Sequence, residues 1–305
     1  MSFQKYLPLF LSCLLLISAC RENHKQEQTI PVTIARDSLA RPQAKEEAAT
    51  QQVLSIHFHI LKLDSTIIVH LKDSFSEKQL DLISMLNRID IEKVYKVNKL
   101  IVPDTFLLSP LSYAPFPDSL KLIASVRRIL LVSYSIQAFA AYENGRLVRW
   151  GPISMGKKST PTPTGLFFTN WKSRETKSTV DDAWVLKWYF NIVNESGVSL
   201  HQFDLPGYPA SHSCIRLKAE DAEWFYYWAE QWIVAQDKIH IRAHGTPVII
   251  FGNYGFRKKA PWLKLKDDPH ANDFSADSLS NKLQQYIPEI KEKETQRDSV
   301  AIRGT

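Results

Sequence analysis

The chain has 305 residues, of which 44% are hydrophobic, and this is enough to bury the core of one or two domains. The formal net charge is +6 and the basic residues are scattered, so the composition excludes a nucleic-acid-binding module. A charge of this size favours weak attraction to an anionic wall or membrane surface, and an ordinary solvated surface explains it equally well.

The N-terminal residues resemble a bacterial lipoprotein signal. Lys5 precedes an apolar run from Tyr6 to Ile17, and Ser18-Ala19-Cys20 follows. Because the run is too short to span a bilayer, we expect residues 1–19 to be a cleaved signal peptide. The resemblance implies that Cys20 receives lipid and holds the protein at the periplasmic face of a membrane of the bacterial cell envelope. Residues 20–52 are polar with almost no aromatics, which predicts a disordered, lipid-anchored tether.

Residues 53–106 predict a small α+β module. Apolar residues at 56, 58 and 60 alternate with His57 and His59, as in a half-buried strand. Ser76-Glu77-Lys78-Gln79 has the spacing of a capping box and predicts a helix start. A second short helix is predicted from Asp90, and Leu100-Ile101-Val102-Pro103 closes the module.

This order of elements weakly resembles a degenerate LysM-like glycan-binding module, and a structural lid or spacer fits the pattern as well. The two histidines could ligate a metal, but they lack a third nearby ligand. A solvent-facing pair is therefore the favoured interpretation, and we predict no metal site.

Residues 127–252 predict a β-rich domain. Glu143-Asn144-Gly145-Arg146 indicates a two-residue hairpin, because Asn-Gly suits the positive φ values of a type I′ turn. Apolar strand patterns occupy residues 129–132, 139–142, 147–153, 166–168, 184–192, 198–200 and 245–251. Ala222, Phe225, Ala229 and Trp232 recur at helical spacing and predict one helix beside these strands. Residues 253–305 are charged, and we expect a loosely attached C-terminal tail that ends in a frayed helix.

One short stretch, from His201 to Arg216, concentrates chemically active side chains, among them His212 and Cys214. Cysteine acts as a nucleophile only as the thiolate, so a reactive one needs a base and an electropositive setting. After removal of the leader with Cys13 and lipidation of Cys20, the one free thiol left in an oxidising compartment is Cys214. A buried structural cysteine with core histidines is the weaker reading of this cluster.

Five segments of this region form a pattern in a fixed order. They are Tyr142-Glu-Asn-Gly-Arg-Leu-Val148, Met155-Gly-Lys-Lys-Ser-Thr-Pro-Thr-Pro-Thr-Gly165, Pro206-Gly-Tyr-Pro-Ala-Ser-His212, Cys214-Ile-Arg216 and Gly245-Thr-Pro-Val248. In this order they resemble the L,D-transpeptidase catalytic domain. The resemblance implies a mainly β, β-sandwich-like domain with one flanking helix and with the cysteine at one edge of the sheets.

The resemblance also implies a role for each matching residue. Cys214 corresponds to the nucleophile, His201 to the histidine that takes the thiol proton, and His212 to a histidine that lines the site. Arg216 supports the site and faces a substrate carboxylate. Three further positions are expected at the substrate: Ser211, Ser213 and Tyr208.

The sequence departs from the family at two positions in this region. Ser213 stands where glycine is usual, and Gln202 stands where glycine or alanine commonly follows the first histidine. If the family glycine adopts a positive φ, a serine there is strained by about 1 kcal/mol.

The implied reaction is acyl transfer on peptidoglycan stem peptides through a Cys214 thioester, with release of D-alanine, formation of 3–3 crosslinks, and no metal or organic cofactor. The same thioester permits hydrolysis, as in a carboxypeptidase or endopeptidase, or attachment of a protein to the wall. An inactive, lipid-anchored wall-binding protein and a protease of another fold remain alternatives. We expect a monomer.

Overall fold

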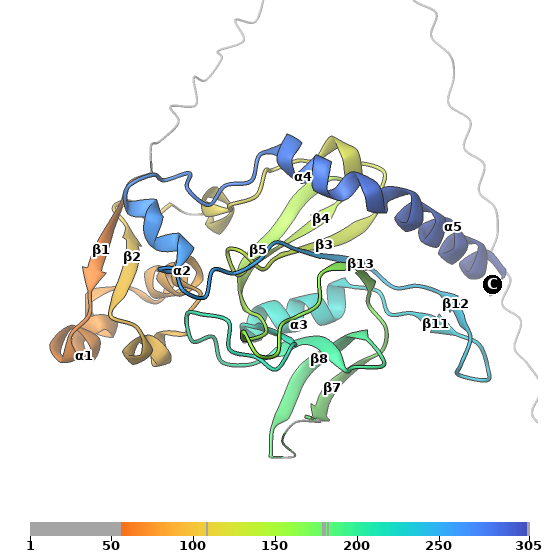
Figure 1. The fold of residues 1–305 in the computed structure, drawn as a ribbon, viewed down its shortest axis with the longest axis horizontal. Coiled ribbons are helices and arrows are strands. Elements are labelled where there is room, and N and C mark those ends of the chain that lie inside the picture. Colours follow the sequence, from red (N-terminus) through yellow and green to blue (C-terminus); the bar gives the residue numbers. More distant parts are fainter. Residues whose placement is uncertain (1–55, 108, 179–180, 182, 304–305) are drawn as a thin grey trace, which may run out of the picture. The chain divides into compact units, whose positions relative to one another are not determined.

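A computed structural model describes residues 56–107, 109–178, 181 and 183–303 (Figure 1). The predicted signal peptide, the lipidated Cys20 and the tether to residue 52 lie outside these ranges. Within them, no helix combines the length and the apolar composition required to cross a bilayer.

The predicted α+β module is a two-stranded antiparallel sheet with helices between its strands. Strand β1 (Phe58–Lys62) pairs with β2 (Lys99–Pro103), and α1 (Ser65–Ser74), α2 (Glu77–Asn87) and the 3₁₀ helix η1 (Ile91–Lys96) connect them. The predicted capping box is present at the start of α2, where the side chain of the N-cap serine accepts from Gln79 N and the Gln79 side chain accepts in return.

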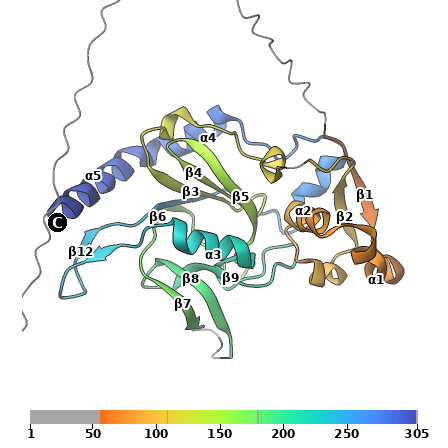
Figure 2. The same cartoon turned by 180° about the vertical axis from the view of Figure 1, so that it is seen from behind.

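The rest of the chain is mainly β, as predicted. One sheet has the strand order β6-β13-β3-β4-β5-β10-β9-β8-β7. It curls so that β7 and β8 project from the body of the molecule (Figures 1 and 2). The bounds are β3 (Arg128–Ser133), β4 (Ala138–Glu143), β5 (Arg146–Ser154), β6 (Gly165–Phe168), β7 (Lys172–Lys177), β8 (Val185–Val193), β9 (Val198–Gln202), β10 (Ile215–Leu217) and β13 (Pro247–Phe251).

Shorter elements surround this sheet. Helix α3 (Ala219–Trp228) follows β10, and a separate two-stranded ladder joins β11 (Ile233–Val234) to β12 (Ile241–Ala243). The remaining elements are the 3₁₀ helices η2 (Pro110–Tyr113), η3 (Lys121–Ile123), η4 (Pro261–Lys266) and η5 (Gln284–Tyr286), and the helices α4 (Ala276–Leu283) and α5 (Ile287–Arg303).

The β4–β5 hairpin forms at the predicted Asn-Gly pair. Asn144 and Gly145 have φ values of 47° and 75°, which fits a type I′ turn. A Cβ at Gly145 would lie 2.6 Å from Leu120 O, so the close packing of η3 against the turn also requires glycine.

The expectation of a loosely attached tail is wrong. Trp262, Leu279 and Ile290 are at most 2% exposed and belong to the same hydrophobic cluster as Ile129 of β3 and Phe58 of β1. The expectation is based on the charged residues of this segment. Its apolar side chains are widely spaced and form no continuous hydrophobic run, yet they lie on the buried faces of η4, α4 and α5.

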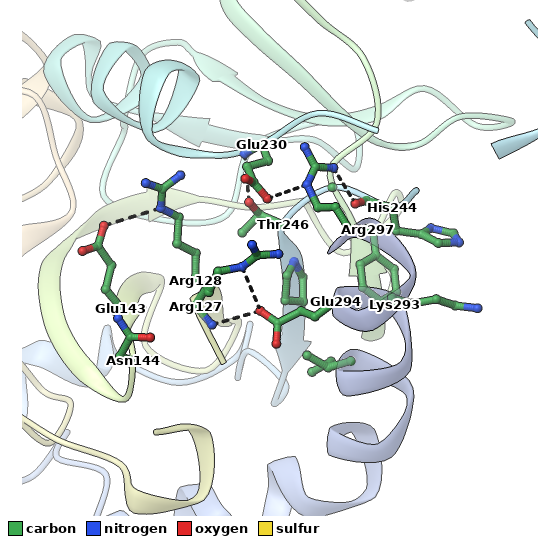
Figure 3. Close-up of a pocket in the computed structure, with 14 residues that line it drawn as sticks. Arg127, Arg128, Glu143, Asn144, Glu230, His244, Thr246, Lys293, Glu294 and Arg297 are labelled. Atoms are coloured by element: carbon green, nitrogen blue, oxygen red, sulfur yellow. Dashed lines mark hydrogen bonds and ion pairs between the residues drawn. The ribbon is translucent and has the colours of Figure 1, made fainter. Parts of the chain in front are cut away.

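Ion pairs hold α5 against β3 and the loop after α3 (Figure 3). Arg297 Nε lies 2.8 Å from Glu230 Oε2, and Arg127 Nη1 lies 2.9 Å from Asp298 Oδ1. A cavity of about 230 Å³ remains between these elements. Because its arginines are paired with carboxylates, we attribute this cavity to the docking of α5 and not to catalysis.

Candidate active site

Two parallel neighbouring strands bring the predicted catalytic residues together. Strand β10 pairs with β9 in a register that sets Arg216 opposite His201. Cys214 directly precedes β10 and therefore lies beside Ser199 of β9. Because side chains on a strand alternate between its two faces, all four of these residues point to the same face of the sheet.

These side chains line a cavity of about 440 Å³. Cys214, His201, His212, Arg216 and Ser211 all contribute to its wall. Its aromatic lining comes from Trp171, Trp184, Tyr189 and Phe203. A cavity of this volume with a few converging polar groups has the character of a ligand site.

Cys214 is a free, half-buried cysteine. Its Sγ lies 3.4 Å from Ser199 Oγ and 3.8 Å from Gly197 O. Within the described ranges these are its hydrogen-bond partners, and Sγ makes no hydrogen bond to His201. Catalytic hydrogen bonds are often long in a ligand-free site and tighten when substrate binds.

His201 is buried, with 4% of its surface exposed. Its Nδ1 lies 2.9 Å from the carbonyl oxygen of Gln202, to which it donates. Burial lowers the pKa of His201 to about 4, and the positive charge of Arg216 adds to this effect. The ring is therefore neutral at neutral pH and keeps Nε2 as a free proton acceptor.

His212 has a different environment. The Lys157 ammonium lies 2.9 Å from His212 Nε2 and can only donate to it, so the proton of the neutral ring sits on Nδ1. Burial and the charges of Lys157 and Arg216 lower the pKa of His212. Its Nδ1 is buried and has no hydrogen-bond partner among the described residues. This ring is therefore set up as a hydrogen-bond donor, whereas His201 is set up as a base.

Arg216 supplies positive charge to the cavity. Its guanidinium lies 4.4 Å from the centre of the Phe203 ring, and its Nη1 lies 3.5 Å from Asp204 O. No carboxylate of the described chain forms an ion pair with it. Burial lowers the pKa of Arg216, though the group stays cationic at neutral pH.

The loop before Cys214 is fixed by polar contacts. The buried Ser211 donates from Oγ to Cys214 O at 2.5 Å, and Ser211 N donates to Met155 O at 3.0 Å. Ser213 has a φ of 84°, a conformation that L-residues disfavour. Neither Ser213 nor Tyr208 lines the cavity, and Tyr208 is 43% exposed.

Several side chains at the site were not predicted from the sequence. Ser199 and Lys157 contact Cys214 and His212, and the aromatic wall includes Trp184 and Phe203. Trp184 and Leu186, two residues apart around the start of β8, both line the cavity, but a register shift at Trp188 turns that ring towards Tyr226 of α3, so simple alternation does not identify the aromatic wall. No local signal marks Ser199, because its role depends on the pairing of β9 with β10.

Comparison with known proteins supports a family for part of the chain. Residues 127–250 match the sequence model of YkuD, the L,D-transpeptidase catalytic domain. L,D-transpeptidase 1 from two strains of Mycobacterium tuberculosis is 32% identical to this chain over 111 residues. The match covers 32% of this chain and 44% of each relative, so the chain spans less than half of the relatives' length.

Similar solved structures include an L,D-transpeptidase from Stackebrandtia nassauensis, with 20% identity and a TM-score of 0.34 over 42% of this chain and 56% of the other. The LD transpeptidase LdtMt1 in complex with imipenem has 23% identity and a TM-score of 0.33 over 41% of this chain and 59% of the other. These TM-scores are low, so the assignment rests on the sequence comparisons. The sequence model and the curated relatives together support the assignment of residues 127–250 to the YkuD family of L,D-transpeptidase catalytic domains.

Proposed function

We propose that this protein is a cysteine-dependent L,D-transpeptidase that acts on peptidoglycan stem peptides. The observation that carries the proposal is that Cys214, His201, His212 and Arg216 line one cavity. A thiol, a neutral histidine with a free ring nitrogen, and an unpaired guanidinium are the groups that acyl transfer to and from a carboxylate-bearing peptide requires.

In the first step, His201 Nε2 takes the proton of the Cys214 thiol. The thiolate attacks the carbonyl carbon that links the third residue of the stem to the terminal D-alanine. A C–S bond forms, the C–N bond breaks, and D-alanine leaves with the proton from His201. Backbone N–H groups near Cys214 stabilise the oxyanion, a contribution typically worth about 3 kcal/mol.

In the second step, the amine of a neighbouring stem attacks the thioester carbonyl. A new C–N bond forms, the C–S bond breaks, and the amine proton returns through His201 to the solvent or to the thiolate. The product is a 3–3 crosslink. No redox partner or metal is needed for the balance of either step.

Arg216 is proposed to bind a carboxylate of the stem, because its guanidinium lies in the cavity wall without an acidic partner. His212 Nδ1–H is proposed to donate to the substrate or to the developing oxyanion. Ser211 positions the Cys214 backbone, and Ser213 and Tyr208 are proposed to affect substrate binding through the loop.

The test is mass spectrometry of purified protein mixed with disaccharide-tetrapeptide. The expected result is a thioester adduct on Cys214, free D-alanine and a crosslinked dimer, all absent from Cys214→Ala and Cys214→Ser. Release of D-alanine without dimers would instead show hydrolysis. Crosslinking at the wild-type rate in Cys214→Ala would refute the proposal.

The two histidines serve as a matched pair in the same assay. A general base typically contributes about 10²–10⁴-fold, so His201→Ala should slow adduct formation far more than His212→Ala. Thiol alkylation measured against pH should change its profile in His201→Ala only. An unchanged profile would mean that another group is the base.

We also propose that the protein is held at a cell-envelope membrane through lipid on Cys20. The support is the sequence Ser18-Ala19-Cys20 after a short apolar run. A fatty-acid probe fed to expressing cells should label the wild type, while Cys20→Ala should stay unlabelled. Equal labelling of both proteins would exclude this attachment site.

A further inference from the structure

The segment that joins His201 to Cys214 leaves the sheet and contacts the N-terminal module. Residues 203–214 connect the parallel strands β9 and β10, and Ile89, just after α2, forms an antiparallel bridge with Pro206 of this segment. Two backbone hydrogen bonds flank the bridge, from Asp90 N to Leu205 O and from Gly207 N to Arg88 O, each at 2.9 Å.

The carboxylate of Asp90 completes this contact. Its Oδ2 accepts from Leu205 N at 2.8 Å, so both backbone polar groups of Leu205 are bound by Asp90. Leu205 itself is fully buried. An unpaired N–H at such a buried position costs about 1–3 kcal/mol, so the carboxylate fixes this residue in place.

The turn that carries Asp90 is held in place by the contacts of Arg88. Arg88, with a φ of 54° and 2% exposure, donates to Ile136 O at 3.0 Å and to Leu86 O at 2.6 Å. Its guanidinium packs 5.1 Å from the Trp262 ring. The turn that carries Asp90 is thus tied to the module, to the sheet domain and to the C-terminal segment.

We propose that Asp90 is a positioning residue for the thioester chemistry, because its carboxylate and backbone fix Leu205 and thereby the segment between His201 and Cys214. This inference rests on the proposed function. The module then acts on catalysis through this contact and not through the cavity, which Asp90 does not line.

The ionisation of Asp90 favours a strong hydrogen bond from Leu205 N at neutral pH. Burial, with the negative charges of Asp204 and Glu92, raises the pKa of Asp90 to about 6, against the opposing effects of the Leu205 N–H and Lys218. At pH 7 the group is therefore mainly ionised. An ionised acceptor makes a stronger hydrogen bond than a neutral one.

The experiment compares three variants of the full chain. Asp90→Ala removes the acceptor, Asp90→Asn keeps an oxygen that can accept from Leu205 N, and Glu92→Ala is the control. Glu92 lies two residues away and forms its ion pair with Lys72 inside the module. Its negative charge raises the pKa of Asp90, so its removal leaves Asp90 ionised at pH 7.

We expect Asp90→Ala to lower kcat for D-alanine release by about ten- to a hundredfold, since small misplacements of catalytic groups have effects of this size. KM should change little, because the cavity is left intact. The rate of Cys214 alkylation should fall in parallel at temperatures below the melting transition. Asp90→Asn should recover most of the loss, and Glu92→Ala should match the wild type.

Wild-type kcat and alkylation rate in folded Asp90→Ala would overturn the inference, and so would an Asp90→Asn variant as impaired as Asp90→Ala. The proposed function fails separately, through activity that survives Cys214→Ala. The two failures are therefore distinguishable in one set of assays.

Discussion

The thiol of Cys214 lies 3.4 Å from the hydroxyl of Ser199, on the strand next to its own. Ser199 is fully buried, and its side chain also forms a hydrogen bond with Tyr189 of β8. A hydroxyl in this place can donate to a thiolate, and a hydrogen bond to a charged group favours the charged form. The neighbouring strand thus takes part in the environment of the proposed nucleophile.

Ser199→Ala should therefore slow alkylation of Cys214 at neutral pH by about fivefold, equivalent to about 1 kcal/mol. Iodoacetamide labelling followed by mass spectrometry measures this rate. Ser133→Ala removes an equally buried serine on β3 and should leave the rate unchanged. An unaltered rate in Ser199→Ala would mean that the thiolate does not depend on this hydroxyl.

Ser213→Gly should stabilise the protein. Ser213 has a φ of 84°, and an L-residue in that region costs about 1 kcal/mol relative to glycine. Its hydroxyl makes one long contact, 3.4 Å to Thr160 O, which offsets little of this cost. Urea unfolding should show the gain.

Acylation of Cys214 in Ser213→Gly, measured as thioester formation with disaccharide-tetrapeptide, should at least match the wild-type rate. Ser109→Gly is the control, since Ser109 is exposed, has a φ of -101° and does not line the cavity. A drop in acylation of more than about tenfold, or 1.4 kcal/mol, would show that the hydroxyl has a role that strain does not explain.

His201 should make stability depend on pH. Its pKa falls from the usual 6.5 to about 4 in the folded protein, so the unfolded chain binds the proton more readily. The neutral His201 ring therefore contributes to the free energy of unfolding. This contribution is fully present above pH 6.5 and is lost as the pH falls towards 4, by about 3 kcal/mol in total. The difference in unfolding free energy between wild type and His201→Asn should shrink over this range. A difference that is constant with pH would show that the folded site does not disfavour the imidazolium.

Arg297→Ala should detach α5 in part. Besides its pairing with Glu230, Arg297 donates to Gln231 O at 3.0 Å and to His244 O at 2.8 Å. Loss of this half-buried network should cost about 2 kcal/mol. Hydrogen exchange of α5 and thermal melting measure the effect. Lys291→Ala, at an exposed position of the same helix, should leave both the hydrogen exchange and the melting temperature unchanged. Equal effects of the two substitutions would contradict the role of Arg297 in holding α5.

Local signals made much of the fold predictable. The Asn144-Gly145 turn and the Ser76 capping box depend on residues that are close together in the sequence, and both are present as predicted. Helix α1 was not predicted, because its β-branched residues Thr66, Ile67, Ile68 and Val69 favour strands. Tertiary packing and the Asp64 cap, which accepts from Ile67 N, override that preference.

The site was predictable in its residue types and not in its contacts. The cluster from His201 to Arg216 is visible in the sequence, whereas the neighbours of each side chain depend on strand register and on loops that return from elsewhere. Lys157 reaches His212 from the loop after β5, and Asp90 reaches Leu205 from the module. Neither contact has a signal within its own segment, because each depends on long-range pairing.

Phe58, Ile129 and Ile290 belong to one buried hydrophobic cluster, and this limits how early in folding the cluster can be completed. Phe58 and Ile290 come from opposite ends of the described chain, and contacts so distant in sequence form slowly because the long loop between them must close first. The sheet around Cys214 can pair its strands early, yet its outer layer is completed only when α5 arrives. The folding chain therefore passes through a stage in which the apolar side of β3 is still bare, and at that stage it is most exposed to aggregation.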